Sequence, residues 1–258
     1  MEDLIQSPIG NLVARHPATS RVFRRYKLDF CCGGGKTVAE ACAARGLDPA
    51  ALAEELRCVV EHGAGGASED EAAPDWMHED LGALVRFIIE RYHVPLREEL
   101  ERLRQMSRRV LAVHGERSPD LWPPLDAVLE RVRVSLLDHM DCEESVLFPG
   151  VVRLRDLAAR AGSGASSPDA DRQLPLGRPI DSMEADHDRV GAHLRTIREL
   201  TSDFTLPPEA CNTVRALFDG LENLEHEMHD HVHLENEVLF PRALELERAL
   251  FGRSDAIA

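Results

Sequence analysis

The sequence predicts an all-α protein, with a small helical N-terminal domain followed by an antiparallel four-helix bundle. Hydrophobic residues make up 43% of the 258 residues and aromatic residues only 5%, so the apolar side chains are mostly Leu, Val and Ala, which favour helices. Four long segments after Pro74 repeat apolar residues at the spacing of a helix. Most of the connections between these segments are short, as is typical of antiparallel neighbours in a bundle.

The N-terminal domain is expected to span residues 1–62. Pro8 and Pro17, together with a run of three glycines, divide it into short segments, because proline and glycine interrupt helical patterns. The clearest helices cover residues 37–45 and 49–61. This part of the chain is therefore expected to be a set of short helices joined by turns.

A linker and a loop divide the rest of the chain. Residues 63–75 contain Gly, Ala, Ser and acidic residues without a hydrophobic period, a composition typical of a flexible linker. The bundle is assigned to residues 76–252, and a polar segment over 162–179 is expected to form a solvated loop between its two halves. The third bundle helix has a start that resembles a capping box, Asp181-Ser-Met-Glu184. The predicted bundle helices run from 75 to 113, from 123 past 148, from 181 to 202 and from 209 to 250.

The bundle contains an internal repeat. The motif D-H-x-x-x-E-x-x-V-L-F-P occurs at residues 138–149 and again at 230–241. A single histidine lies on the helix before each copy, His93 in the first half and His187 in the second. The bundle is therefore predicted to be a duplicated helical hairpin, in which each half supplies one lone His and one His-x-x-x-Glu pair.

The histidines and glutamates of this repeat fall on the apolar stripes of their helices. Such a stripe is the face that a bundle helix turns toward its partners. Each His-x-x-x-Glu pair projects from adjacent turns of one face, because its two residues are four apart. The stripes comprise Ile89, His93, Leu96, Leu100 and Leu103 in the first helix; Leu125, Leu129, Val132, Leu136, His139, Glu143 and Val146 in the second; Met183, His187, Val190, Leu194 and Ile197 in the third; and Leu217, Leu221, Leu224, Met228, His231, Glu235 and Val238 in the fourth.

These polar groups on buried stripes indicate a metal centre. A buried carboxylate without a partner costs several kcal/mol, which is large against a domain stability of about 5–15 kcal/mol. Bound cations supply the charge that such carboxylates need. The candidate metal ligands are His93, His139, Glu143, His187, His231 and Glu235.

The donor set favours iron, because imidazoles and carboxylates without a required thiolate suit manganese or zinc less well. With both glutamates and an oxo or hydroxo group as bridges, roughly ten of twelve octahedral positions on two irons are filled, which leaves an open position for O₂ or NO. The expected cofactor is therefore a non-haem di-iron centre. The other histidines, including His229 and His233, leave the stripes and are expected on solvated faces. Pro95 is expected to kink the first helix near His93.

Six cysteines occur without a paired framework, which indicates thiols rather than disulfides. Cys31 and Cys32 are adjacent, and adjacent cysteines pair poorly with each other, so we expect two exposed thiols near a flexible turn. The Gly-Gly-Gly-Lys-Thr segment that follows does not fit a phosphate-binding P-loop. Phe30 takes the place of that motif's first glycine, and no strand precedes it.

Together these residues resemble the RIC (repair of iron centres) family, di-iron proteins with a hemerythrin-like bundle and an N-terminal domain of the ScdA type. The resemblance covers nearly the whole chain. The motifs that carry it are Phe23-Arg-Arg-Tyr-Lys-Leu-Asp-Phe-Cys-Cys-Gly-Gly, Arg91-Tyr-His93, His139-x-x-x-Glu143, Glu184-Ala-Asp-His187-Asp, Pro207-Pro-Glu-Ala-Cys211 and His231-x-x-x-Glu235-x-x-x-Leu-Phe-Pro241.

The resemblance implies a cytoplasmic protein that restores iron–sulfur clusters damaged by nitrosative or oxidative stress. It implies that the six candidate ligands bind iron, with Glu143 and Glu235 bridging, and that Cys31 and Cys32 have a functional role. Oxygen-carrying hemerythrins typically use a fifth histidine, which this set lacks, so a reversible oxygen carrier is disfavoured.

Three functional hypotheses follow for the centre. In the leading one it reacts with NO or labile iron, and the N-terminal domain brings Cys31 and Cys32 to the bundle or to a client, where the thiols accept iron, deliver it or supply electrons. The second is a sensor or scavenger that binds NO or O₂ without catalysis. The third is an enzyme, a di-iron NO reductase that forms N₂O.

The charge balance limits the expected partners. Asp and Glu number 46 against 30 Lys and Arg, a net charge of −16, which argues against nucleic acid or an anionic membrane. No apolar stretch approaches the roughly 20 residues needed to span a bilayer, and the N-terminus lacks the pattern of a signal peptide, so a cytoplasmic location is expected. Expected partners are NO or O₂ as a small ligand and damaged iron–sulfur proteins as clients, with a homodimer left open.

Overall fold

The computed structural model describes residues 2–31, 33–62, 74–162 and 175–252. Two expected segments, the linker and the loop between the halves of the bundle, therefore lie largely outside the described residues. By its backbone contacts the chain divides into two compact units. One unit consists of residues 1–84 and 229–243, and the other of residues 85–228 and 244–258.

The N-terminal part of the first unit is a set of short helices around its own core, as expected. Thr37 caps α4 through a capping box with Glu40, and the left-handed Gly46 ends that helix. Phe23 and Phe30 lie at the centre of the core, where both side chains are fully buried. The helices are α1 (Glu2–Gln6), α2 (Ile9–Arg15), η1 (Pro17–Thr19), α3 (Ser20–Arg25), α4 (Val38–Arg45) and α5 (Pro49–His62).

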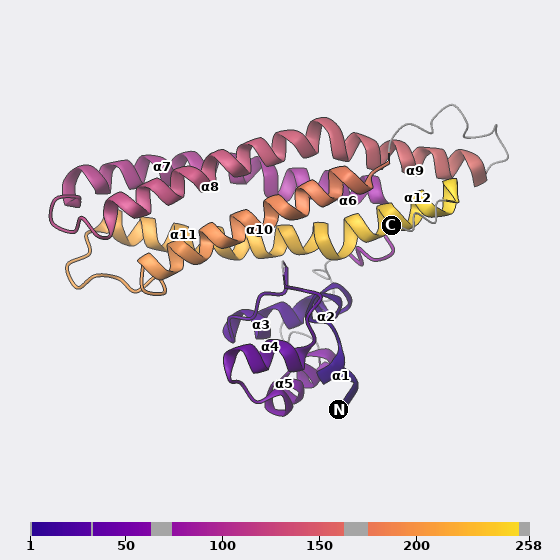
Figure 1. The fold of residues 1–258 in the computed structure, drawn as a ribbon, viewed down its shortest axis with the longest axis horizontal. Helices are drawn as coiled ribbons and strands as arrows, with labels where there is room; N and C mark the ends of the chain where they lie inside the picture. Colours follow the sequence, from indigo (N-terminus) through magenta and orange to yellow (C-terminus); the bar gives the residue numbers. More distant parts are fainter. Residues whose placement is uncertain (1, 32, 63–73, 163–174, 253–258) are drawn as a thin grey trace. The chain divides into compact units, whose positions relative to one another are not determined.

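The remaining helices build the bundle, and Figure 1 shows α7, α8, α10 and α11 running alongside one another. Short connections join α7 to α8 and α10 to α11, so the two members of each pair run antiparallel. The hydroxyl of Ser107 on α7 donates a hydrogen bond to Asp126 on α8. The elements are α6 (Leu81–Ile88), η3 (Ile89–His93), α7 (Val94–His114), α8 (Trp122–Cys142), η4 (Glu143–Leu147), α9 (Phe148–Gly162), α10 (Gly177–Leu200), α11 (Asn212–Leu234), η6 (Glu235–Leu239) and α12 (Phe240–Phe251).

Two predicted helix starts are wrong. The first bundle helix begins at Leu81 rather than near residue 75, because the carboxylate of Asp80 accepts the backbone N–H of Ala83 and so caps the helix there. The third begins at Gly177 rather than at residue 181. The apolar face of α10 already starts at the buried Ile180, and a proline in its first turn is compatible with a helix start.

Three of the bundle helices contain a π turn, which periodicity did not predict. The turns η3, η4 and η6 each end immediately before a residue that precedes a proline: Pro95, Pro149 and Pro241. Proline has no N–H and clashes with the carbonyl four residues earlier, and a widened turn accommodates both effects. The residue before each proline donates instead to the carbonyl five residues back. The irregularity expected at Pro95 is therefore a change of helical register.

The π turns also explain where the predicted stripes fail. A five-residue turn advances the helix by one extra residue, so a 3.6-residue pattern loses phase across it. Val146 lies inside η4 and is 53% exposed, whereas the next residue, Leu147, is buried. Ile89, the first residue of η3, is only half-buried. The other stripe residues are buried.

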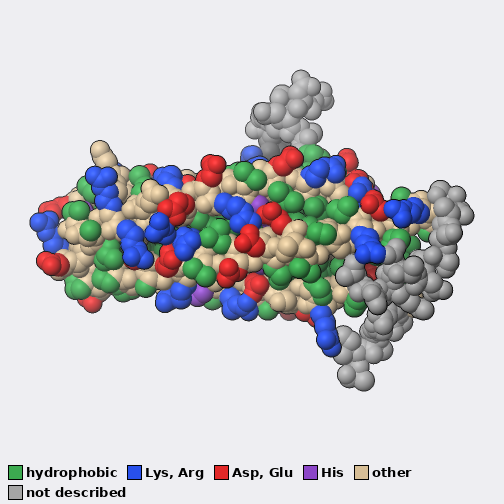
Figure 2. Space-filling model, turned by 90° about the horizontal axis from the view of Figure 1, so that it is seen from above, with side chains coloured by type: hydrophobic (Ala, Val, Ile, Leu, Met, Phe, Trp, Pro, Cys, Tyr) green, Lys and Arg blue, Asp and Glu red, His purple; other side chains and the backbone are tan. Residues whose placement is uncertain are grey.

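The bundle surface is polar and mixed in charge. Figure 2 shows Lys and Arg side chains interspersed with Asp and Glu on one face, with hydrophobic side chains scattered between them. This pattern is typical of the solvated faces of amphipathic helices. Within the described residues, every helix is too short or too polar to cross a lipid bilayer.

Candidate metal centre

All six residues predicted as metal ligands are buried. His93 ends η3, Glu143 begins η4 and Glu235 begins η6, so three of the six lie at the π turns. The side chains of Glu143 and Glu235 are 0% exposed. Because α11 continues directly into η6, Glu235 lies on the same helix as the bundle residues before it.

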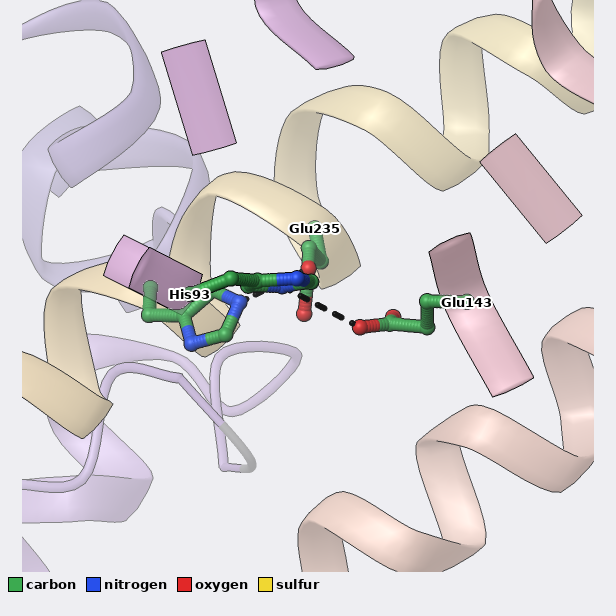
Figure 3. Close-up of side chains that lie close together, drawn as sticks. His93, Glu143 and Glu235 are labelled. Atoms are coloured by element: carbon green, nitrogen blue, oxygen red, sulfur yellow. Dashed lines mark hydrogen bonds and ion pairs between the residues drawn. The ribbon is translucent and has the colours of Figure 1, made fainter. Parts of the chain in front are cut away.

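Histidine side chains from three different helices gather around the carboxylate of Glu143. The Nε2 atom of His93 lies 3.4 Å from Oε2 of Glu143, and Nε2 of His139 lies 3.2 Å from the same oxygen. His187 joins them from α10, with its Nε2 3.1 Å from Nε2 of His139. Figure 3 shows His93, Glu143 and Glu235 converging, with the ion pair between the first two dashed.

The six side chains form two overlapping groups of four. In each group one ligand atom per residue can be chosen so that all of these atoms lie within 4.8 Å of one another. Both glutamates belong to both groups, and each group adds two of the four histidines. One group is His93, Glu143, His231 and Glu235, and the other is His139, Glu143, His187 and Glu235.

The donor set fits iron. Two fully buried carboxylates in one cluster repel each other, and each loses its hydration, so the cluster is unfavourable without cations between the donors. Neutral imidazoles and carboxylates are the ligands of non-haem iron. Nε2 of His231 lies 2.9 Å from Oε1 of Glu235, which places the donors of this pair side by side.

Glu144, the residue after Glu143, was not singled out in the sequence. Burial alone would raise the pKa of Glu144, but hydrogen bonds from His93 and Arg97 outweigh it and hold the pKa below its usual value. Glu144 therefore stays anionic beside a candidate ligand. One feature of the sequence could have pointed to Glu144: the first copy of the repeat has two adjacent acids, whereas the second copy has only one at these positions.

The expectation of an exposed thiol at Cys31 is wrong. Cys31 is 4% exposed, because the carboxylate of Asp29 accepts the backbone N–H groups of Cys31 and Gly33 and folds the segment inward. The Sγ of Cys31 lies 3.3 Å from the same Asp29 oxygen. Its carbonyl accepts a hydrogen bond from Nδ2 of Asn236 in the same compact unit, at 3.1 Å. Cys32 lies outside the described residues.

Gly34, within the glycine run, has a steric cause. A Cβ at Gly34 would lie 2.8 Å from the carbonyl oxygen of Phe30, closer than real side chains come, and it would also collide with Glu237. A glycine is therefore required where this backbone folds tightly behind Cys31.

The solvated face expected for His233 is also wrong. His233 is buried, and its ring meets the edge of the Phe30 ring at 5.7 Å between centroids. Burial lowers the pKa of His233 to about 4, so this imidazole is neutral at pH 7. His229 is half-buried and contacts the same ring at 5.8 Å. A helical stripe predicts the face toward the bundle and misses a second packed face on the same helix.

Cys211 is a second group whose role the sequence pattern does not indicate. It immediately precedes α11, and hydrogen bonds from the backbone of Val214 and Thr213 hold the pKa of its thiol below the usual value. The side chain is exposed, and its Sγ lies 3.7 Å from Nε2 of His114. An exposed thiol with a larger thiolate fraction reacts faster with electrophiles.

We therefore expect Cys211 to be alkylated by iodoacetamide at pH 7 several-fold faster than the exposed Cys58. Peptide mass spectrometry after timed quenching measures both rates in one sample. The advantage should shrink as the pH rises above about 8.5, where an ordinary thiol also ionises. Equal rates for the two cysteines at pH 7 would contradict the lowered pKa.

The fold and the site together define a hemerythrin-like cation-binding protein. The family model of the Hemerythrin HHE cation binding domain matches residues 84–243. The model of ScdA_N, a Domain of Unknown function (DUF542), matches residues 5–59. These matches confirm the all-α fold class predicted from the sequence.

Relatives that match over nearly their whole length define the family more narrowly than the two domain models do. The chain is 38% identical over 242 residues to the iron-sulfur cluster repair protein YtfE of Yersinia pseudotuberculosis serotype IB (strain PB1/+), which covers 94% of this chain and 98% of that protein. YtfE of Yersinia pestis (strain Pestoides F) matches with the same identity and coverage. This chain belongs to the YtfE family of iron–sulfur cluster repair proteins, and the resemblance to the RIC family is confirmed.

Proposed function

We propose that this protein repairs iron–sulfur clusters damaged by nitrosative or oxidative stress, using a non-haem di-iron centre in its bundle. The observation that carries the proposal is the sharing of Glu143 and Glu235 by two overlapping four-residue groups. Two groups with common carboxylates match the ligand requirements of two metal ions with bridging carboxylates. The names of the relatives, which cover nearly the whole chain, support the repair activity.

Each of the six side chains has a proposed role. His93 and His231 would hold one iron, and His139 and His187 would hold the other, in line with the two groups. Glu143 and Glu235, which belong to both groups, would be shared by the two irons, and an oxo or hydroxo group would complete the centre. When bound, this centre supplies an open position for NO or O₂ and a source of iron or electrons for the damaged cluster.

The protein keeps these donors dry and oriented. Phe148 stacks on the ring of His93, with centroids 5.5 Å apart and planes 25° apart. The side chains of His139 and His187 pack edge to face at 4.7 Å. Burial by neighbouring rings excludes water from the donors and restricts the imidazoles to few orientations.

We assign the thiols of Cys31 and Cys32 to the transfer of iron or electrons. The support is the hydrogen bond from Asn236 to the carbonyl of Cys31, since Asn236 directly follows Glu235. A protein with both cysteines changed to serine should bind iron normally and lose repair activity. Intact repair activity in that double variant would exclude the thiols from the reaction.

The proposal also covers the domain division, the cellular location, the clients and the oligomeric state. We retain the division into an N-terminal domain (1–62), a linker (63–75) and a bundle (76–252). We place the protein in the cytoplasm, with damaged iron–sulfur proteins as clients, and a homodimer is to be tested by light scattering.

The proposal is tested by metal analysis and a repair assay on protein purified without oxygen. About two irons per chain are expected, with loss of about one iron and of repair in each of the variants His139→Leu and His231→Leu. The assay follows the reactivation of an NO-treated [4Fe–4S] enzyme. His78→Leu is the matched control, because His78 is exposed and pairs with the nearby Asp75. Repair at the wild-type rate in these iron-depleted variants would show that the intact centre is not used.

A further inference from the structure

The two halves of the bundle differ next to the candidate ligands. When the two copies of the repeat are aligned, Glu144 in the first corresponds to Asn236 in the second. When the lone histidines are aligned, Arg97, four residues after His93, corresponds to Gly191, four residues after His187. An acid and a base near one histidine are thus replaced by an amide and a glycine in the other half.

In the first half, the acid and the base form a chain that ends on His93. Nδ1 of His93 lies 2.9 Å from Oε1 of Glu144, and Nη2 of Arg97 donates to the same oxygen at 3.0 Å. Arg97 also pairs with Asp141 at 2.7 Å. An ionised carboxylate can only accept a hydrogen bond. Nδ1 of His93 therefore carries the ring proton and donates a hydrogen bond to Glu144.

This tautomer leaves the lone pair of His93 on Nε2. That atom faces the shared carboxylate, 3.4 Å from Oε2 of Glu143. Glu143 and Glu144 therefore approach the ring at different nitrogens. Glu144 accepts the hydrogen bond from Nδ1, whereas Glu143 lies beside the lone pair of Nε2, where a bound cation would satisfy both donors.

The second half has no equivalent chain at the corresponding described positions. The Nδ2 of Asn236 donates to the carbonyl of Cys31 at 3.1 Å, and an amide offers no anionic acceptor. In the other four-residue group, the first-half ligand His139 faces a carboxylate of the second half, but Oδ2 of Asp186 lies 3.7 Å from Nδ1 of His139, which is beyond hydrogen-bond distance. Asp186 is also engaged by Arg189.

We propose that Glu144, held by Arg97, is a positioning residue for His93 and makes the two metal positions of the centre inequivalent. The proposal rests on the di-iron centre of the proposed function. A carboxylate that accepts from a ligand histidine fixes the ring and makes it a stronger donor. The position served by His93 should therefore bind its metal more tightly than it does without Glu144, while the position served by His139 and His187 is unaffected.

The test is an anaerobic titration of the metal-free protein with Fe(II), followed by calorimetry and by Mössbauer spectroscopy with ⁵⁷Fe. The wild-type protein should bind two ions. Glu144→Gln keeps the size and hydrogen-bonding capacity of the side chain but removes its charge, and it should weaken one binding step by about 10–100-fold and leave the other unchanged. Arg97→Met should act in the same direction. Glu98→Gln, an exposed residue on the same helix, is the matched control.

The spectrum gives a readout that a general loss of packing would not produce. One of two iron signals should shift in Glu144→Gln, and Glu144→Asp should restore part of the wild-type spectrum. Two equally weakened steps, or an unchanged titration and spectrum, would overturn the role of Glu144. Failure of the wild-type protein to bind two ions would instead overturn the di-iron centre itself, so the two failures are distinguishable.

Discussion

Replacement of Glu143 by alanine is expected to empty both metal positions at once, whereas His187→Leu should affect only one. Glu143 belongs to both four-residue groups, and His187 to one of them. Loss of a direct ligand should weaken binding by well over the 100-fold typical of residues that only support a ligand. Iron per chain should therefore fall from about two to nearly none in Glu143→Ala and to about one in His187→Leu.

The measurement is iron content after purification without oxygen, with circular dichroism to confirm that each variant is folded. Glu130→Ala is the matched control. Glu130 lies on α8, the helix that continues into Glu143, but its side chain pairs with Arg133 near the surface. It should retain the wild-type iron content. If Glu143→Ala and His187→Leu lost iron to the same extent, the carboxylate would not be shared between two positions.

Replacement of Arg198 by alanine is expected to lower the free energy of unfolding by about 3 kcal/mol or more. Arg198 joins α10 to α11 through both oxygens of Glu225, with Nε 3.1 Å from Oε1. Glu225 is buried, so the variant leaves a carboxylate without its charge partner in a dry interior. Arg198 also pairs with Asp203 and lies 4.7 Å above the ring of Phe204.

The loop that Arg198 holds is itself strained. Ser202, Asp203 and Phe204 have φ values of 48°, 61° and 56°, a left-handed conformation that side chains other than glycine disfavour. Contacts from Arg198 to two of these residues offset that cost. Removal of the guanidinium should therefore destabilise the connection between α10 and α11 as well as Glu225.

Urea unfolding of the metal-free protein measures this effect without a contribution from bound iron. The matched control is Arg102→Ala, because Arg102 forms a similar two-oxygen contact with Glu99 at the surface, where an ion pair contributes about 1 kcal/mol or less. A double variant, Arg198→Met with Glu225→Met, should recover much of the lost stability, since no buried charge remains. Equal losses of unfolding free energy in Arg198→Ala and Arg102→Ala would show that burial does not determine how much such an ion pair contributes to stability.

The bundle was predictable because its information is local and periodic. Each stripe repeats apolar residues at the spacing of a helix. The six polar exceptions are three positions that occur once in each half, as in His139-x-x-x-Glu143 and His231-x-x-x-Glu235. All six lie buried in the two groups. Burial of so many polar groups is unfavourable without cations, so the pattern itself indicated a metal site.

Local irregularities were not predictable from a 3.6-residue period. The π turns displaced Val146 from the interior, although the prolines after them were visible in the sequence. Cys31 and His233 were placed on the surface and are buried, because Asp29 and Phe30 supply contacts that no periodic pattern contains. Such contacts depend on turns and side chains whose partners lie far away along the chain.

The sequence by itself determined the helices of the bundle and the kinds of donor that face its interior. Both depend on residue type and on spacing within one helix, which a chain carries without its fold. Only the tertiary structure decided which histidines share a group, that Glu143 and Glu235 belong to both groups, and that Glu144 contacts His93. These relations join residues that are separated by whole helices, and packing in three dimensions alone brings them within a few ångströms.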